Sequence, residues 1–192
     1  MQITYFCRSF GSSNTGVDKK ILAQVKNLSN QGINAIIYPA HADNTQKCTN
    51  RETRRVQIPI IGPLNGIVGK IKREYQVNLA FKSLISTLKA QDVVYLRIPY
   101  PSPNLSRILR QPRACKVVIE YQTIEPFEYK LKGKYWYLLI DFLFGRTIRK
   151  HTDAIVGVTD EITQYEVSCS GDPEKPHITI GNGFDVASVP AR

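Results

Sequence analysis

The feature that most constrains the fold is an alternation of short, continuously apolar runs with longer segments of helical periodicity. Runs such as residues 33–39 ("INAIIYP"), 116–122 ("KVVIEYQ") and 153–159 ("DAIVGVT") place apolar residues on both sides of an extended chain. Strands of this kind lie in parallel sheets that helices cover on both faces. The sequence therefore predicts an α/β fold, a Rossmann-like three-layer α/β/α domain with a mainly parallel sheet of about seven strands.

The same pattern gives the order of the elements. The expected strands are residues 3–7, 33–39, 56–61, 92–99, 116–122, 153–159 and 177–181. The expected helices are residues 17–31, 77–88, 102–111, 134–150 and 160–168. The third helix has Ser102 as its expected N-cap and Pro103 at its first position. Residues 123–133 are expected to form a loop, and the chain shows no internal repeat, so we expect one domain.

The net charge and the cysteine content limit the kinds of partner and the cellular compartment that the chain is expected to have. The 192 residues include 26 Lys and Arg against 16 Asp and Glu, a formal net charge of +10. This excess favours an anionic partner: nucleic acid, a phosphate-bearing small molecule or an acidic membrane surface. No recognised nucleic-acid-binding motif is present, so no nucleic acid is expected. The four cysteines form no C-x-x-C pair and no signal-peptide pattern opens the chain, which indicates a cytoplasmic, reducing location.

The loop after the first expected strand is a candidate site, because ligands of open parallel sheets bind beyond the carboxyl ends of the strands. Residues 8–16 ("RSFGSSNTG") are mostly small and bring Gly16 to the start of a helix, where backbone N–H groups can bind an anion. A plain strand–helix connection accounts for these residues equally well. Neither G-x-G-x-x-G nor G-x-x-x-x-G-K-[ST] occurs, which argues against a NAD-type dehydrogenase and a P-loop NTPase.

Two later strand ends carry charged side chains. Arg97 ends a strand with Tyr100 nearby, and its guanidinium could pair with a phosphate or carboxylate; the alternative is a surface arginine on the rim. Glu120 could accept hydrogen bonds from sugar hydroxyls; the alternatives are a solvated acid or an ion pair with a neighbouring lysine. No metal site or cofactor is expected, because metal-ligand spacing is missing among the histidines His41, His151 and His177.

Residues 130–150 ("KLKGKYWYLLIDFLFGRTIRK") combine a strongly apolar centre with basic flanks. Aromatic and basic residues together suit an anionic lipid interface. The commoner role of such a stripe is a helix that packs on the sheet and has basic ends, and both interpretations stay open. The apolar run is too short to span a bilayer, and Asp141 interrupts it.

Residues 3–32, 154–162 and 178–189 carry a resemblance when they are taken together and in order. They resemble the N-terminal half of retaining GT-B glycosyltransferases, with family 4 as the nearest group, and the first segment matches that family's strand, glycine loop and first helix. Residues 117–130 ("VVIEYQTIEPFEYK") are similar to a loop of polysaccharide-synthesising members. Residues 182–185 ("NGFD") resemble the turn that precedes the crossing into the second domain.

The resemblance implies that residues 1–185 form the acceptor-side domain and that residues 186–192 begin an interdomain linker, with the C-terminal donor domain absent. It implies that the donor diphosphate and the acceptor face Asn14, Thr15 and Gly16. The acceptor side of the cleft would be lined by Glu120, Gln122 and Thr123, joined by Arg97 and Tyr100 of the strand-end loops. The turn near the hinge would be shaped by Asn182 and Gly183.

The implied activity is transfer of a sugar from a nucleotide-sugar donor to a glycan or lipid-linked acceptor, in polysaccharide or glycoconjugate synthesis. The resemblance implies no protein nucleophile and no metal, so no catalytic residue is assigned, and charge stabilisation of the leaving diphosphate is the main contribution. The isolated domain is expected to be inactive, and its expected location is cytoplasmic, with peripheral contact to the inner face of a membrane left open. The main alternative is a stand-alone Rossmann-like module that binds a small molecule or an anion, of the flavodoxin or receiver type. A receiver needs paired acids after its first strand, and "CRSFG" offers none.

Overall fold

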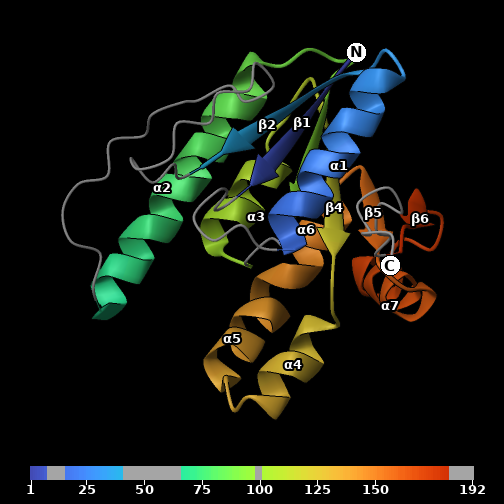
Figure 1. Cartoon of the computed structure of the whole chain (residues 1–192). Coiled ribbons are helices and arrows are strands. Elements are labelled where there is room, and N and C mark those ends of the chain that lie inside the picture. Colours follow the sequence, from blue (N-terminus) through green and yellow to red (C-terminus); the bar gives the residue numbers. More distant parts are fainter. Residues whose placement is uncertain (8–15, 41–65, 98–100, 182–192) are drawn as a thin grey trace, which may run out of the picture.

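The fold is a six-stranded parallel sheet with helices on both faces (Figure 1). The computed structural model describes residues 1–7, 16–40, 66–97 and 101–181. The strands are β1 (Gln2–Cys7), β2 (Asn34–Pro39), β3 (Val93–Arg97), β4 (Lys116–Tyr121), β5 (Ala154–Gly157) and β6 (His177–Thr179). Their order in the sheet is β2-β1-β3-β4-β5-β6, and all pairs are parallel. This confirms the predicted fold class with six strands; the expected strand at residues 56–61 lies outside the described residues.

The helices fill the connections between the strands. They are α1 (Gly16–Asn30), α2 (Gly66–Thr87), α3 (Pro103–Arg110), α4 (Glu125–Leu131), α5 (Tyr135–Ile140), the π-helix η1 (Asp141–Gly145), α6 (Arg146–His151) and α7 (Asp160–Ser170). Helix α3 begins as predicted, because the Ser102 side chain accepts a hydrogen bond from the Leu105 N–H at 3.1 Å and Pro103 follows it.

Two predictions about residues 123–150 were wrong in detail. The expected loop contains α4, and Pro126 lies in its first turn, where a proline is compatible with a helix. Glu125 in that turn and Lys130 in the last one suit the helix dipole. The expected single helix over 134–150 is α5, η1 and α6 in succession, with a π-helical segment in the middle.

The handedness of the crossovers divides the helices between the two faces. The chain moves from β1 to β2 in one direction and from β3 through to β6 in the other, so right-handed connections place α1 on one face and the later helices on the opposite one. Ile21 and Val25 of α1 are accordingly buried against Tyr5, Ile37 and Tyr95. The larger apolar cluster on the other face combines strand residues with side chains of α2, α3, α6 and α7.

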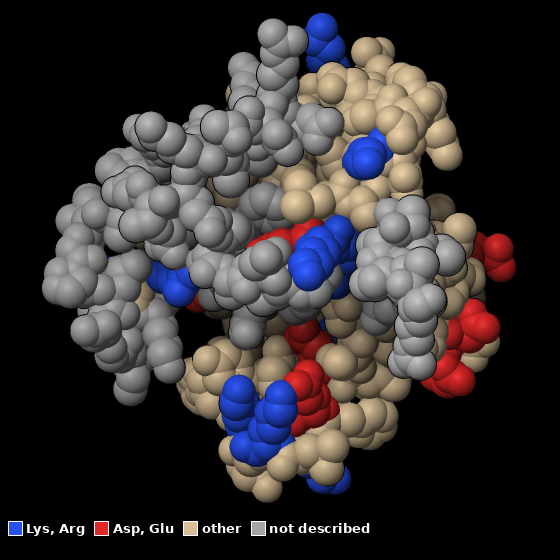
Figure 2. Space-filling model, viewed as in Figure 1, with Lys and Arg blue, Asp and Glu red and all other residues tan. Residues whose placement is uncertain are grey.

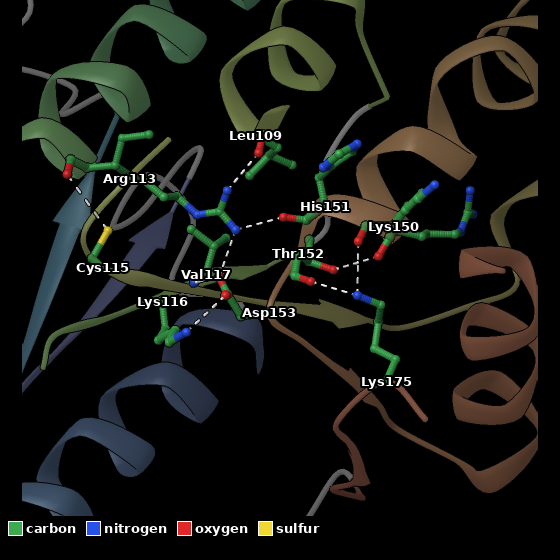
Figure 3. Close-up of polar contacts among 12 residues, drawn as sticks. Leu109, Arg113, Cys115, Lys116, Val117, Lys150, His151, Thr152, Asp153 and Lys175 are labelled. Atoms are coloured by element: carbon green, nitrogen blue, oxygen red, sulfur yellow. Dashed lines mark hydrogen bonds and ion pairs between the residues drawn. The ribbon is translucent and has the colours of Figure 1, made fainter. Parts of the chain in front are cut away.

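A polar network joins α3, α6, β4 and β5 at the amino ends of these two strands (Figure 3). The Arg113 guanidinium donates hydrogen bonds to the carbonyls of Leu109 and His151, and to the Asp153 carboxylate at 2.7 Å. That carboxylate also accepts the Val117 N–H at 2.8 Å. Burial alone would raise the pKa of Asp153, but the hydrogen bonds from Val117 and Arg113 outweigh it and lower the pKa. The network satisfies backbone groups where strands begin and lies at the opposite end of the sheet from the loops expected to bind ligands.

Candidate functional site

The strand order places a switch point between β1 and β3. The chain leaves β1 toward β2 on one side and later returns to form β3 on the other. In doubly wound sheets, ligands bind at the carboxyl ends of the strands at such a point. Cys7 ends β1 and Arg97 ends β3, so both lie at this edge of the sheet, and Glu120 is the register partner of Arg97 on β4.

Glu120 is the centre of a buried polar cluster on the α1 face of this edge. Its side chain is 1% exposed. One carboxylate oxygen, Oε2, accepts the Tyr95 hydroxyl at 2.6 Å. The other, Oε1, accepts the Lys20 ammonium of α1 at 3.3 Å and the amide of Gln122. Both oxygens are therefore engaged within the protein, which suits a positioning role better than that of a base or nucleophile.

Arg97 brings a second cation to the same carboxylate. Its Nε lies 3.5 Å from Glu120 Oε1, and its side chain is 6% exposed, so the alternative of a surface arginine on the rim is wrong. The nitrogens Nε and Nη1 are buried and hydrogen-bond to none of the described residues. A buried guanidinium nitrogen without a hydrogen-bond acceptor costs free energy, so an incoming acceptor group such as a phosphate or carboxylate oxygen would be favoured there.

The structure decides between the two alternatives to sugar binding that the sequence left open for Glu120. The predicted pairing with a neighbouring lysine is present, since Lys20 contacts the carboxylate. The solvated-acid alternative is wrong, because β3, β4 and α1 enclose the side chain. Sequence reasoning missed Lys20 and Tyr95 as members of the cluster. Their signal was weak: Lys20 is one polar position of a helix, and Tyr95 is an aromatic residue within an apolar strand.

Burial keeps the neighbouring tyrosine hydroxyls and the Cys7 thiol protonated. Burial and the Glu120 charge raise the pKa of the Tyr5 hydroxyl to about 12. Burial raises the pKa of Tyr95 as well, and Glu120 adds to this. Burial also raises the pKa of the Cys7 thiol to about 12, despite the opposing charge of Arg97. Cys7 is therefore a neutral thiol rather than a nucleophile at ordinary pH.

The remaining predicted residues divide between described and undescribed parts of the chain. Gly16 begins α1, as expected of a residue at a helix start. The Thr123 hydroxyl is exposed and donates to Glu128 of α4 at 3.1 Å, so the structure gives it a local contact outside the Glu120 cluster. Outside the described residues lie Asn14, Thr15, Tyr100, Asn182 and Gly183.

A second buried polar cluster lies on the opposite face of the same edge, and the sequence did not predict it. Arg149 of α6 donates to Glu166 of α7 and, at 3.0 Å, to Asp141 of η1. Its guanidinium lies over the ring of Tyr121, 5.5 Å from the centroid. Glu125 of α4 is also buried on this side. The only signal in the sequence was Asp141, a carboxylate inside an apolar run.

Burial raises the pKa of Glu125 to about 7, and the charges of Asp141 and Glu166 add to this against a hydrogen bond from Tyr129 and the charge of Arg149. The Tyr129 hydroxyl donates to Glu125 at 2.6 Å. Among the residues that the structure describes, no group of three or more His, Cys, Asp and Glu could hold a metal ion.

Comparisons with known proteins support the fold without identifying a family. No family model and no curated protein matches the chain. The chain is similar to the N-terminal domain of Candida albicans trehalose-6-phosphate phosphatase, with a TM-score of 0.51 and 15% identity, over 90% of this chain and 43% of that one. It is also similar to a trehalose-6-phosphate structure from E. coli bound with UDP-2-fluoro glucose, with a TM-score of 0.50 and 10% identity, over 89% of this chain and 43% of that one.

The chain thus spans less than half the length of each of these structures. At such identities the likeness concerns the fold alone. The chain has a GT-B-like, Rossmann-like α/β fold, as the resemblance implied; membership of family 4 has no support from these structures.

Proposed function

We propose that this chain is the acceptor-side domain of a retaining GT-B glycosyltransferase. In the complete enzyme it would help transfer a sugar from a nucleotide-sugar to a glycan or lipid-linked acceptor. The fold supports this, because the similar structures are an N-terminal domain of a sugar-phosphate enzyme and a protein bound to a nucleotide-sugar analogue. The family 4 grouping rests on the sequence resemblance.

The observation that carries the proposal is the Lys20–Arg97–Glu120 cluster at the switch point. Two cations share one carboxylate there, and Nη1 of Arg97 is a buried donor without an acceptor among the described residues. Oε1 of Glu120 contacts both cations and limits their motion, so little side-chain entropy remains to be lost when a ligand binds. The arrangement suits an anionic group on the sugar substrate, and a phosphate oxygen fits a guanidinium particularly well.

The role of these residues in transfer would be binding and charge stabilisation. Arg97 and Lys20 would hold the anionic group, and the buried setting would strengthen their effect on developing negative charge. Glu120 would keep both cations in place. The groups that complete the reaction would lie in a second domain, so we expect no sugar transfer by this chain alone.

Binding can be tested on the 192-residue chain by calorimetry and thermal unfolding with UDP, UDP-glucose, glucose 6-phosphate and glucose. We expect the chain to bind at least one phosphorylated ligand and not glucose. Lys20→Gln should weaken that binding about tenfold, because a charge-assisted contact is lost. Lys26→Gln is the matched control, since Lys26 is exposed on the same helix. Absence of binding to all phosphorylated ligands, or equal binding by the two variants, would contradict the proposal, as would robust sugar transfer by the chain itself.

A second candidate is a stand-alone module that binds a small molecule or an anion. The strand order favours it, because β2-β1-β3-β4-β5 is also the order of flavodoxin-like folds, which bind a flavin nucleotide at the same switch point. Flavin that co-purifies with the chain, visible by its absorbance, would support this candidate over the glycosyltransferase.

A further inference from the structure

The helices after β4 expose several large apolar side chains. Helices α4 and α5 lie beyond the carboxyl end of β4, away from the body of the sheet (Figure 1). Leu131 is 87% exposed, Phe142 is 80% exposed and Trp136 is 68% exposed. We call this group the apolar surface; it consists of Phe127, Leu131, Tyr135, Trp136, Leu139, Phe142 and Leu143. The expectation that this stripe packs on the sheet is therefore wrong for most of its aromatic residues.

The helical run α5–η1–α6 buries polar side chains beside the apolar Ile148 and leaves several large apolar side chains exposed. Its buried side chains include Asp141 and Arg149, which pair with each other, while Trp136, Leu139 and Leu143 point outward at a spacing of three and four residues. Helices of globular proteins normally bury their apolar stripe. Ile148 of α6 follows this rule, but the exposed apolar side chains of α5 and η1 do not, so these remain for a partner outside the described residues.

Basic side chains are exposed on the same helices and on the segment that joins them. Lys130 is exposed in the last turn of α4, Lys132 and Lys134 are exposed between α4 and α5, and Arg146 is exposed at the start of α6. Figure 2 shows blue basic side chains, with red acidic ones beside them, among tan surface at the end of the molecule where Figure 1 places α4 and α5. Glu128, an acid of α4, is paired with Lys132. The charge of this surface is complementary to an anionic partner.

We propose that the apolar surface docks on an anionic lipid bilayer. Tryptophan, tyrosine and phenylalanine in combination with lysine suit the boundary between headgroups and acyl chains, where aromatic rings insert and ammonium groups meet lipid phosphates. Within the described residues, no helix has the length and apolar character needed to cross a membrane. The contact is therefore peripheral. It does not depend on the proposed transferase activity, which concerns the Lys20–Arg97–Glu120 cluster.

Trp136 provides a direct test, because it is the single tryptophan of the chain. The 192-residue chain is mixed with vesicles of phosphatidylcholine, with or without phosphatidylglycerol, and its fluorescence and flotation are measured. We expect the emission to move to shorter wavelengths with anionic vesicles, and bromine-labelled lipid to quench it. High salt should reduce the binding. Unchanged emission with all vesicles would overturn the proposal, and so would a wavelength shift that follows protein concentration without lipid, which would identify a second copy of the chain as the occupant.

Paired variants separate the apolar and charged contributions. Leu139→Ser with Phe142→Ser should weaken binding by at least about tenfold, because apolar area no longer enters the bilayer. Ile71→Ser with Tyr75→Ser on α2 is the control, since both side chains are exposed elsewhere. Lys130→Gln with Lys134→Gln should weaken binding about fivefold per lysine, whereas Lys82→Gln with Lys89→Gln should leave it unchanged. Circular dichroism verifies that each variant is folded; equal loss from test and control pairs would contradict a defined docking surface.

Discussion

Lys20 and Glu120 are 100 residues apart in the chain, yet the Lys20 ammonium lies 3.3 Å from Glu120 Oε1. The contact joins α1 to the end of β4, although the two elements are not consecutive in the chain. Because Arg97 of β3 lies 3.5 Å from the same oxygen, one carboxylate holds together a helix and two strands at the switch point. The residues of the candidate site therefore also hold neighbouring elements of the fold together.

The first prediction concerns this carboxylate. Glu120→Gln should destabilise the protein by about 3 kcal/mol, because Lys20 and Arg97 would be left as enclosed like charges without their counter-ion. Urea unfolding measures the change. Glu174→Gln provides the control, because Glu174 is exposed and a surface substitution there should stay within about 0.5 kcal/mol. A Glu120→Gln variant as stable as this control would show that the cluster is solvated.

The sheet could be predicted from the sequence because its signal is local. Runs such as residues 116–122 are apolar on both sides, and this decides both the strand and its parallel neighbours. The π-helical segment Asp141–Gly145 could not be predicted in this way. Its Asp141 pairs with the buried Arg149, which also contacts Glu166 of α7, and a single sequence does not give these contacts. The burial of α4's Glu125 likewise depends on its neighbours in space.

The candidate site was predicted in position but not in composition. Arg97 and Glu120 could be placed at the ligand edge because strand ends of a parallel sheet lie together. Their mutual pairing follows from the neighbouring positions of β3 and β4, which a single sequence does not give. The loss of solvent around Arg97 depends on what covers it, and this is a property of the assembled fold.

The second prediction concerns the cluster on the opposite face. Arg149→Met should destabilise the protein by about 3–5 kcal/mol, because Glu166 and Asp141 would lose their buried counter-ion. Adding Glu166→Gln to this variant should recover part of the lost stability. Urea unfolding of the parent, the two single variants and the double variant gives the interaction free energy between Arg149 and Glu166. Additive effects of the two substitutions would mean that the pair contributes no interaction of its own.

The third prediction concerns the contact between the end of β5 and α7. A Cβ at Gly157 would lie 2.7 Å from the backbone nitrogen of Thr163, closer than side chains and backbone can approach. Gly157→Ala should therefore destabilise the protein by about 1–3 kcal/mol, measured by thermal or urea unfolding. Gly181→Ala is the matched control, because nothing lies within 4 Å of a Cβ there. Equal stability of the two variants would show that β5 and α7 can separate at no cost.

The last prediction concerns pH. Burial raises the pKa of Glu125 to about 7 in the folded protein, whereas its ordinary value is 4.5. Between these two values the folded state binds more protons than the unfolded state, so Glu125 lowers the stability as pH rises through this window, by up to about 3 kcal/mol.

Glu125→Gln keeps an acceptor for the Tyr129 hydroxyl and removes the titration. Unfolding curves from pH 4 to pH 8 should show that this variant gains stability relative to the parent as pH rises, whereas Glu174→Gln should follow the parent. A constant difference between Glu125→Gln and the parent across this range would mean that Glu125 has an ordinary pKa in the folded protein.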